Sequence, residues 1–157
     1  MDIIIRKATV EDAEQMDKIN RQILPENYEL SFWIGVLSSP NTVAYVIEET
    51  KDDTKSIVGY SVTALDYDNQ RRIIEHVYSI AILQDYRQKG FGKQLFENTE
   101  KNLKEKWRIK KVTLHVRKNN KAAIKFYHKV GYGRLKKVKE YYGKKQDAYL
   151  MGRLLFV

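Results

Sequence analysis

The chain has 157 residues, 43% of them hydrophobic and 31% charged, and this composition predicts one globular domain over residues 1–157 with enough apolar surface for a core. The sequence has no cysteine, no apolar run near the roughly 20 residues of a membrane span and no basic segment of a signal peptide, so we expect a cytoplasmic protein without disulfides, bound metal or membrane contact. A net charge of +9 is compatible with binding to nucleic acid, a ribosome or a polyanionic cofactor, but the sequence has no RNA-binding aromatic signature and no zinc-finger spacing.

The N-terminal segment predicts a short strand over residues 3–6 and then a helix. Thr9 is expected to cap that helix, and the acidic residues at 11 and 12 complement the positive end of the helix dipole. Pro25 ends the helix, because proline lacks a backbone donor and restricts the residue before it. The apolar face of the helix is expected to consist of Val10, Ala13, Met16, Ile19 and Ile23.

A second short helix and three strands are predicted next. The helix covers residues 31–37, and alternation predicts a strand over residues 42–48, followed by a polar turn at residues 51–55. Residues 57–65 and 73–83 are expected to form antiparallel strands joined near residues 68–71.

A basic turn with two glycines follows these strands and leads into a helix that is expected to begin at Gly92. Several backbone N–H groups and a helix N-terminus then point at one place, which makes an anion site. Gly90 and Gly92 permit positive φ angles and close approach of a ligand. A nucleotide loop is disfavoured, because the turn lacks the Gly-Lys-Ser/Thr of the Walker pattern and the third glycine of the dinucleotide fingerprint. The Arg-x-x-Gly-x-Gly spacing after a strand resembles the pyrophosphate loop of the GCN5-related N-acetyltransferases (GNAT), which hold acetyl-coenzyme A there.

The rest of the chain predicts two helices and three strands. A strand over residues 112–116 leads to a helix capped by Asn119 or Asn120 and ended by Gly131, and residues 132–157 form two strands around a turn at 143–145. The order β-α-α-β-β-β-α-β-α-β-β predicts a mixed α/β domain. The helix after the basic turn has an apolar face of Phe91, Leu95, Thr99, Leu103 and Trp107, and the last helix one of Ala123, Ile124, Tyr127 and Val130.

Three further segments resemble one branch of that family, the catalytic subunits of the protein N-terminal α-acetyltransferases, which are related to the bacterial ribosomal-protein acetyltransferases. The segments are Leu24-Pro25-Glu26-Asn27-Tyr28, residues 114–123, and Tyr141-Tyr142 with the following Asp147-Ala148-Tyr149. The resemblance spans the whole chain and implies the acyl-CoA N-acyltransferase fold, a mixed, mostly antiparallel sheet flanked by helices. It also implies acetyl-CoA as co-substrate and protein N-termini or nascent chains as partners. One departure is Gly92, where many close relatives have alanine.

Acetyl transfer requires a neutral amine, hence a proton acceptor, and a proton donor for the departing thiolate. Strand alternation places His76 on one face with Tyr78, Ile80 and Ile82, and His115 on the face opposite Val112, Leu114 and Val116. The resemblance implies that Glu26, His76 and His115 form a water-linked base network and that Tyr127 is the general acid. Which of the three is the principal base stays open.

The resemblance also implies which residues bind the two substrates. Those assigned to acetyl-CoA are Ile80, Ala81, Ile82, Leu83, Arg87, Gln88, Lys89, Gly90, Phe91, Gly92, Lys93, Asn120, Ala123 and Tyr127. Those assigned to the peptide are Leu24, Pro25, Glu26, Tyr28, Tyr78, Tyr141 and Tyr142. Core packing would explain Tyr127 equally, and helix capping would explain Asn120. A closed tyrosine wall would admit an N-terminus threaded from one end and hinder an internal lysine.

Three functions stay open: an N-terminal α-acetyltransferase, a lysine or small-amine acetyltransferase on the same fold, and a non-catalytic binder of RNA or the ribosome. Glu26 in the loop at residues 24–28 is expected to favour small or neutral first residues such as Ser, Ala, Thr or Met and to discourage acidic ones unless a basic residue compensates. Relatives with a similar loop can accept acidic N-termini when they act without a partner subunit, so the resemblance implies a broad first-residue preference. An auxiliary subunit and the oligomeric state are not determined by the sequence. A ribosome contact would use two basic groups, which a solvated surface explains equally: Lys104, Lys106, Arg108, Lys110 and Lys111, and Lys136, Lys137, Lys139, Lys144 and Lys145.

Overall fold

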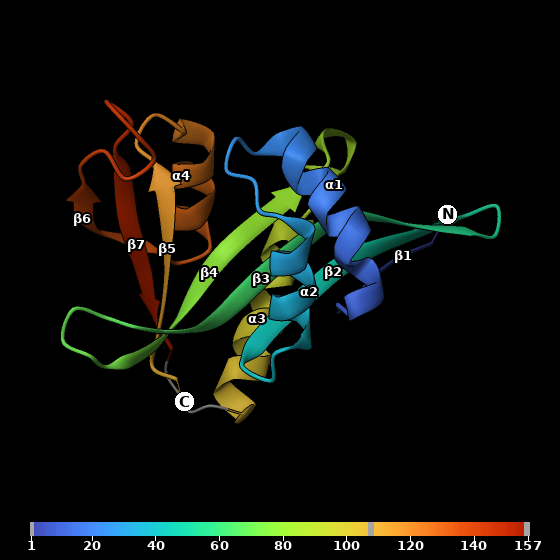
Figure 1. Cartoon of the computed structure of the whole chain (residues 1–157), viewed down its shortest axis with the longest axis horizontal. Coiled ribbons are helices and arrows are strands. Elements are labelled where there is room, and N and C mark those ends of the chain that lie inside the picture. Colours follow the sequence, from blue (N-terminus) through green and yellow to red (C-terminus); the bar gives the residue numbers. More distant parts are fainter. Residues whose placement is uncertain (1, 107–108, 156–157) are drawn as a thin grey trace.

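The computed structural model describes residues 2–106 and 109–155, which form one seven-stranded sheet with helices on both faces (Figure 1). The strands are β1 (Asp2–Lys7), β2 (Thr42–Lys51), β3 (Thr54–Tyr67), β4 (Ile73–Ile82), β5 (Lys111–Arg117), β6 (Gly133–Val138) and β7 (Ala148–Leu154). The helices are α1 (Ala13–Ile23), α2 (Leu30–Ser38), α3 (Phe91–Lys106) and α4 (Lys121–Lys129), with short 3-10 turns η1 (Val10–Asp12) and η2 (Gln84–Tyr86). None of the described helices is long and apolar enough to cross a membrane.

The strands lie in the order β1-β2-β3-β4-β5-β7-β6. Within the described residues β4 and β5 form the one parallel pair, joined by the crossover helix α3, and the other pairs are antiparallel. The predicted mixed, mostly antiparallel α/β fold is therefore confirmed, and so is the predicted order of elements.

Two apolar cores cover the two faces of the sheet. On one face α1 and α2 bury Met16 and Trp33 against the sheet, and on the other α3 buries Leu95. Successive side chains of β2 pack in opposite cores, with Tyr45 in the α3 core and Val46 in the α1–α2 core. Figure 1 shows α1 and α2 in front of the sheet and α3 behind it.

Thr9 is the N-cap of η1, which leads directly into α1, whereas the N-cap of α1 itself is Asp12. The Thr9 N–H donates to the Asp12 carboxylate (2.8 Å), and Arg6 forms an ion pair with the same carboxylate (2.9 Å). α1 ends at Ile23, two residues before Pro25, as predicted.

The predicted helix faces are confirmed in part. Leu95, Thr99 and Leu103 of α3 are buried, and this helix begins one residue before the predicted Gly92. The prediction for Val10 is wrong: it is 41% exposed, because it lies in the tighter η1 turn, which takes it off the face of α1. Trp107 of the predicted α3 face, Arg108 of the first basic group and residues 156–157 of the last predicted strand lie outside the described residues.

β4 and β5 pair over a short stretch and then separate. Residues 75–77 pair with residues 112–114. Beyond this stretch β4 continues to Ile82 beside β3, and β5 continues to Arg117 beside β7, so a wedge opens between them (Figure 1). The backbone edges that face each other across this wedge lack a neighbouring strand, which makes it a place for an extended ligand.

A β-bulge lies in β4 at Tyr78. Val77 pairs with Thr63, and Ser79 pairs with Val62, so Tyr78 is an extra residue with no opposite residue on β3. The bulge lies where the wedge begins, and it shifts the alternation of every β4 residue that follows.

The shifted alternation corrects the predicted face of His76. Beyond the bulge, Ala81 packs in the α1–α2 core, whereas Ile80 and Ile82 pack against the α3–α4 core. Since His76 is opposite Ala64, it shares the face of Ser79 and Ala81. The prediction that it shares a face with Ile80 and Ile82 is wrong, because uninterrupted alternation was assumed.

Candidate active site

The wedge between β4 and β5 holds a cavity of about 680 Å³. The loop after α1 and the loop between β6 and β7 line it on one face of the sheet, and α4 lines it on the other. All of the residues predicted to bind the peptide line this cavity, as do Glu26, His76, His115 and Tyr127, which were predicted to be catalytic. The fold therefore gathers segments from the whole chain at one place.

The residues predicted to bind acetyl-CoA fall into two groups. Four line the cavity, namely Ile80, Asn120, Ala123 and Tyr127. The others lie outside its lining, at the end of β4 and in the turn into α3: Ala81, Ile82, Leu83, Arg87, Gln88, Lys89, Gly90, Phe91, Gly92 and Lys93.

The turn before α3 has the geometry of an anion site. Gln88 and Gly90 have left-handed backbone, with φ of 60° and 87°. The Gln94 N–H donates to the Gly90 carbonyl (3.1 Å), so the N–H groups just before it, in the first turn of α3, have no helical acceptor. A Cβ at Gly90 would meet nothing within 4 Å, and the Arg87 Nε holds the turn against the Ile82 carbonyl (2.8 Å). The turn is open to an anionic group at the positive end of the helix.

The backbone conformation of Gly92 differs from the predicted one. Gly92 lies inside α3 and does not adopt a positive φ, so that prediction is wrong. A Cβ at this position would lie 2.8 Å from the Phe126 ring of α4. Glycine at residue 92 is therefore explained by the close packing of α3 on α4.

His76 and His115 form a hydrogen-bonded pair in the wedge. The His76 Nδ1 lies 2.7 Å from the Thr113 hydroxyl, and its Nε2 lies 3.2 Å from the His115 Nδ1. Burial, with a smaller contribution from His115, lowers the pKa of His76 to about 4. Burial and the nearby Lys136 lower the pKa of His115. Both rings are neutral near pH 7, and two neutral imidazoles in series can pass a proton along their ring nitrogens.

Sequence reasoning missed Arg117, which lies between the predicted residues. Its guanidinium forms an ion pair with Glu26, donates to the Gln146 side chain and lies 4.4 Å from the centre of the Tyr142 ring. It thereby joins the loop after α1 to the loop between β6 and β7 and compensates the charge of Glu26. Strand alternation could have found it, since Arg117 and His115 occupy the same face of β5.

Two residues of α4 and its cap face the wedge from the other side. The Tyr127 ring packs against Phe96 and Tyr132, with centroids 6.0 and 6.4 Å away, and burial raises the pKa of Tyr127 to about 12. Its hydroxyl stays protonated at neutral pH and is a proton donor. The Asn120 Oδ1 accepts from the Ala123 N–H (3.1 Å), so helix capping alone accounts for this asparagine.

Tyrosines form the wall of the cavity on the side of the histidines. Tyr141 stacks on His115 with centroids 4.0 Å apart, and Tyr142 meets Tyr141 edge-on at 4.9 Å. The Tyr78 hydroxyl donates to Asp66 (2.8 Å), and burial together with this bond raises the pKa of Tyr78. The wall thus offers apolar area with protonated hydroxyls, which suits a peptide backbone.

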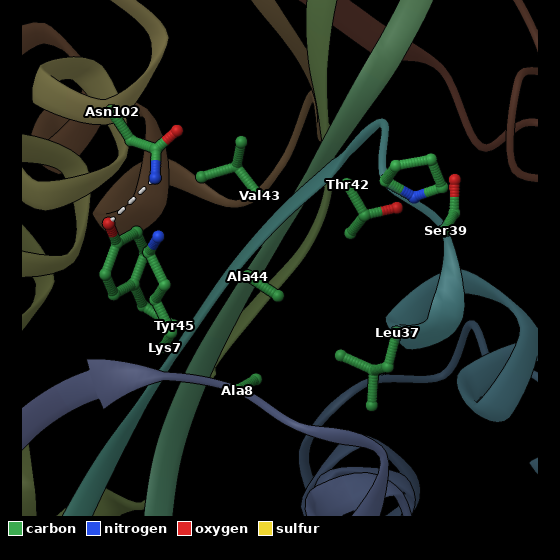
Figure 2. Close-up of a pocket in the computed structure, with 10 residues that line it drawn as sticks. Lys7, Ala8, Leu37, Ser39, Thr42, Val43, Ala44, Tyr45 and Asn102 are labelled. Atoms are coloured by element: carbon green, nitrogen blue, oxygen red, sulfur yellow. Dashed lines mark hydrogen bonds between the residues drawn. The ribbon is translucent and has the colours of Figure 1, made fainter. Parts of the chain in front are cut away.

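A second cavity, of about 240 Å³, lies between the end of β1, the C-terminal end of α2 and α3 (Figure 2). The Asn102 side chain donates to the Tyr45 hydroxyl (3.3 Å) at its wall. None of the predicted site residues lines this cavity, and its lining in the described part of the chain includes no carboxylate or histidine. Acid–base chemistry therefore belongs to the larger cavity.

Comparisons with known proteins agree with the geometry. The acetyltransferase (GNAT) family model matches residues 8–132. An N-alpha-acetyltransferase of Saccharolobus solfataricus is 34% identical over 161 residues, covering 98% of the chain and 94% of the relative. The structure of Arabidopsis thaliana NAA60 in complex with acetyl-CoA superposes with a TM-score of 0.86 at 20% identity, covering 98% of the chain and 99% of that protein. Ard1 from Thermoplasma volcanium superposes with a TM-score of 0.82 at 23% identity over 100% of both chains. At these identities the two structures show a shared fold.

Proposed function

The chain belongs to the acetyltransferase (GNAT) family and is an acetyl-CoA-dependent N-acetyltransferase, and we propose that it acetylates the free α-amino group of protein N-termini. The observation that carries the proposal is that the larger cavity is lined from both faces of the sheet, at the wedge between β4 and β5. An amine and a thioester can approach each other there from opposite sides. The N-alpha-acetyltransferase that is 34% identical over nearly the whole chain supports the same substrate.

The turn before α3 fits the phosphates of acetyl-CoA. The left-handed Gly90, the free N–H groups at the start of α3 and the exposed Lys89 and Lys93 would hold the anionic end of the molecule. The open edge of β4 around Ile80 would guide the rest toward the wedge. Acetyl-CoA itself supplies the acetyl thioester.

Proton removal from the amine would fall to the histidine pair. An α-amino group has a pKa of roughly 7.7–8.0, so a mild base is enough. His115 would take the proton through a water molecule. His76, which is hydrogen-bonded to Thr113 and to His115, would be the second member of this proton relay. Glu26, held by Arg117, would orient the amine and the water.

Tyr127 would complete the reaction from the opposite face. As the bond between the amine nitrogen and the acetyl carbon forms and the carbon–sulfur bond breaks, the departing sulfur would take the hydroxyl proton of Tyr127. Burial in a well-packed cluster raises the pKa of Tyr127, so its hydroxyl stays protonated until the sulfur departs.

Three substrates test this function against its alternatives. We expect acetylation of a peptide with a free N-terminus, and no acetylation of the same peptide with a blocked N-terminus and an internal lysine, or of a polyamine. The tyrosine wall and the Arg117 bridge line the cavity on the peptide side, and we expect them to favour an N-terminus threaded from one end over an internal lysine. Transfer to the blocked peptide would instead favour a lysine acetyltransferase, and transfer to none of them a non-catalytic binder.

We also propose a contact between the basic surface and the ribosome or the nascent chain. The lysines at residues 136, 137, 139, 144 and 145 are exposed around β6 and the loop that forms the peptide wall. Co-sedimentation with ribosomes that weakens steeply with salt would support this contact. The cytoplasmic location stays a prediction.

A further inference from the structure

A buried chain of hydrogen bonds runs from α1 to the large cavity. The Asn20 Nδ2 lies 3.2 Å from the Tyr60 hydroxyl oxygen, which lies 2.7 Å from the Ser79 Oγ. Asn20 and Tyr60 are completely buried, and Trp33 packs edge-on against the Tyr60 ring at 5.3 Å. The core therefore holds this chain of side chains in one arrangement.

Asn20 sets the direction of the chain. An amide nitrogen only donates, so the Tyr60 oxygen accepts from it. The hydrogen of Tyr60 then goes to Ser79, because Ser79 is its other polar neighbour in the described residues and a buried hydroxyl hydrogen without an acceptor is costly. Burial raises the pKa of Tyr60 to about 12, which keeps this hydrogen in place. With the Asn20 amide in this orientation and Tyr60 as the donor, Ser79 accepts in this bond and its own hydrogen is left to point elsewhere.

Ser79 lines the cavity on the side of the peptide loop. It directly follows the bulge at Tyr78, and the shifted alternation places it on the face of His76, toward α1 and α2. Tyr127 and α4 lie on the opposite face. The free hydrogen of Ser79 is thus on the side where the loop after α1 would surround the first residue of the peptide. Ser79 therefore offers a neutral hydrogen-bond donor here, whereas the charge of Glu26 is compensated by Arg117.

We propose that Ser79 is a specificity-determining residue whose hydroxyl donates a hydrogen bond to an oxygen on the side chain of the first substrate residue, with Asn20 and Tyr60 as its positioning residues. The inference rests on the proposed N-terminal acetyl transfer and deepens it. It favours first residues that carry a γ oxygen, serine and threonine, over their apolar counterparts alanine and valine.

The test compares kcat/KM for peptides that are identical after residue one and begin with Ser or Ala, and with Thr or Val. The variants are Ser79→Ala, Ser79→Thr, which retains the hydroxyl, and Tyr60→Phe, which removes the positioning bond. Ser61→Ala is the matched control, because Ser61 lies on the neighbouring strand, is also buried and faces the α3–α4 core.

Ser79→Ala should lower the Ser/Ala and Thr/Val ratios by about two- to tenfold, the effect of one hydrogen bond. Ser79→Thr and Ser61→Ala should keep the wild-type ratios, and Tyr60→Phe, with folding checked by circular dichroism, should lower them. Equal losses on all peptides, or unchanged ratios, in an active Ser79→Ala enzyme would overturn this inference alone. A wild type that acetylates none of these peptides would overturn the proposed function and the inference with it.

Discussion

Replacement of Gly90 by valine should abolish acetyl-CoA binding while leaving the protein folded. Gly90 has a φ of 87°, and a Cβ there would meet nothing within 4 Å, so the cost comes from the backbone and not from a clash. A left-handed conformation costs a side-chain-bearing residue about 1–2 kcal/mol. For a chain of this size that lowers the melting temperature by about 2–8 °C.

The loss of ligand stabilisation should be larger than this strain. At an acetyl-CoA concentration about 100 times Kd, binding stabilises the wild type by about 2.7 kcal/mol, or about 5–10 °C. The valine side chain would occupy the open face of the turn, where the phosphates approach the N–H groups of α3. Differential scanning fluorimetry with and without acetyl-CoA should therefore show no shift for Gly90→Val.

Gly143→Val is the matched control. Gly143 also has a positive φ, of 138°, and also has room for a Cβ, but it lies in the loop between β6 and β7. This variant should lose a similar amount of stability and keep the full acetyl-CoA shift. A Gly90→Val protein that still shows the wild-type shift would refute the assignment of the turn.

Three other predictions concern the chemistry of the cavity. Tyr127→Phe should lower kcat by about 100-fold, the lower range for a general acid, with nearly unchanged acetyl-CoA affinity; normal turnover would reduce Tyr127 to a packing role. Burial gives His76 a pKa of about 4 in the folded protein, below the ordinary histidine value of about 6.5, so between these two values the unfolded chain binds more protons and stability falls as the pH decreases. The advantage of wild type over His76→Gln in urea unfolding should thus be about 3 kcal/mol larger at pH 7 than at pH 4, and a constant difference would contradict the burial argument. Arg117→Gln leaves the charge of Glu26 uncompensated. For peptides with an acidic first residue, kcat/KM should therefore fall about fivefold more than for peptides with a neutral one, which corresponds to ~1 kcal/mol of repulsion. Equal losses would show that Arg117 does not tune the charge of the site.

Local sequence patterns were enough for the elements and for part of the site. Pro25 ends α1 and Asn120 caps α4, because both effects act within one turn of the chain. The alternation in β5 correctly put His115 opposite the buried Leu114 and Val116, because nothing interrupts that strand. The turn after β4 could likewise be predicted from Gly90 and the basic residues around it.

The tertiary structure decided what depends on partners distant in the chain. The bulge at Tyr78 exists only relative to the register of β3, so the sequence of β4 could not show that the faces of Ile80 and Ser79 exchange. Glu26 and Arg117 pair across 91 positions, and the glycine at 92 is explained by the Phe126 ring of another helix. Periodicity and capping act over a few residues and are written into the chain, whereas a bulge, an ion pair or a close helix contact is fixed only when separate elements pack together.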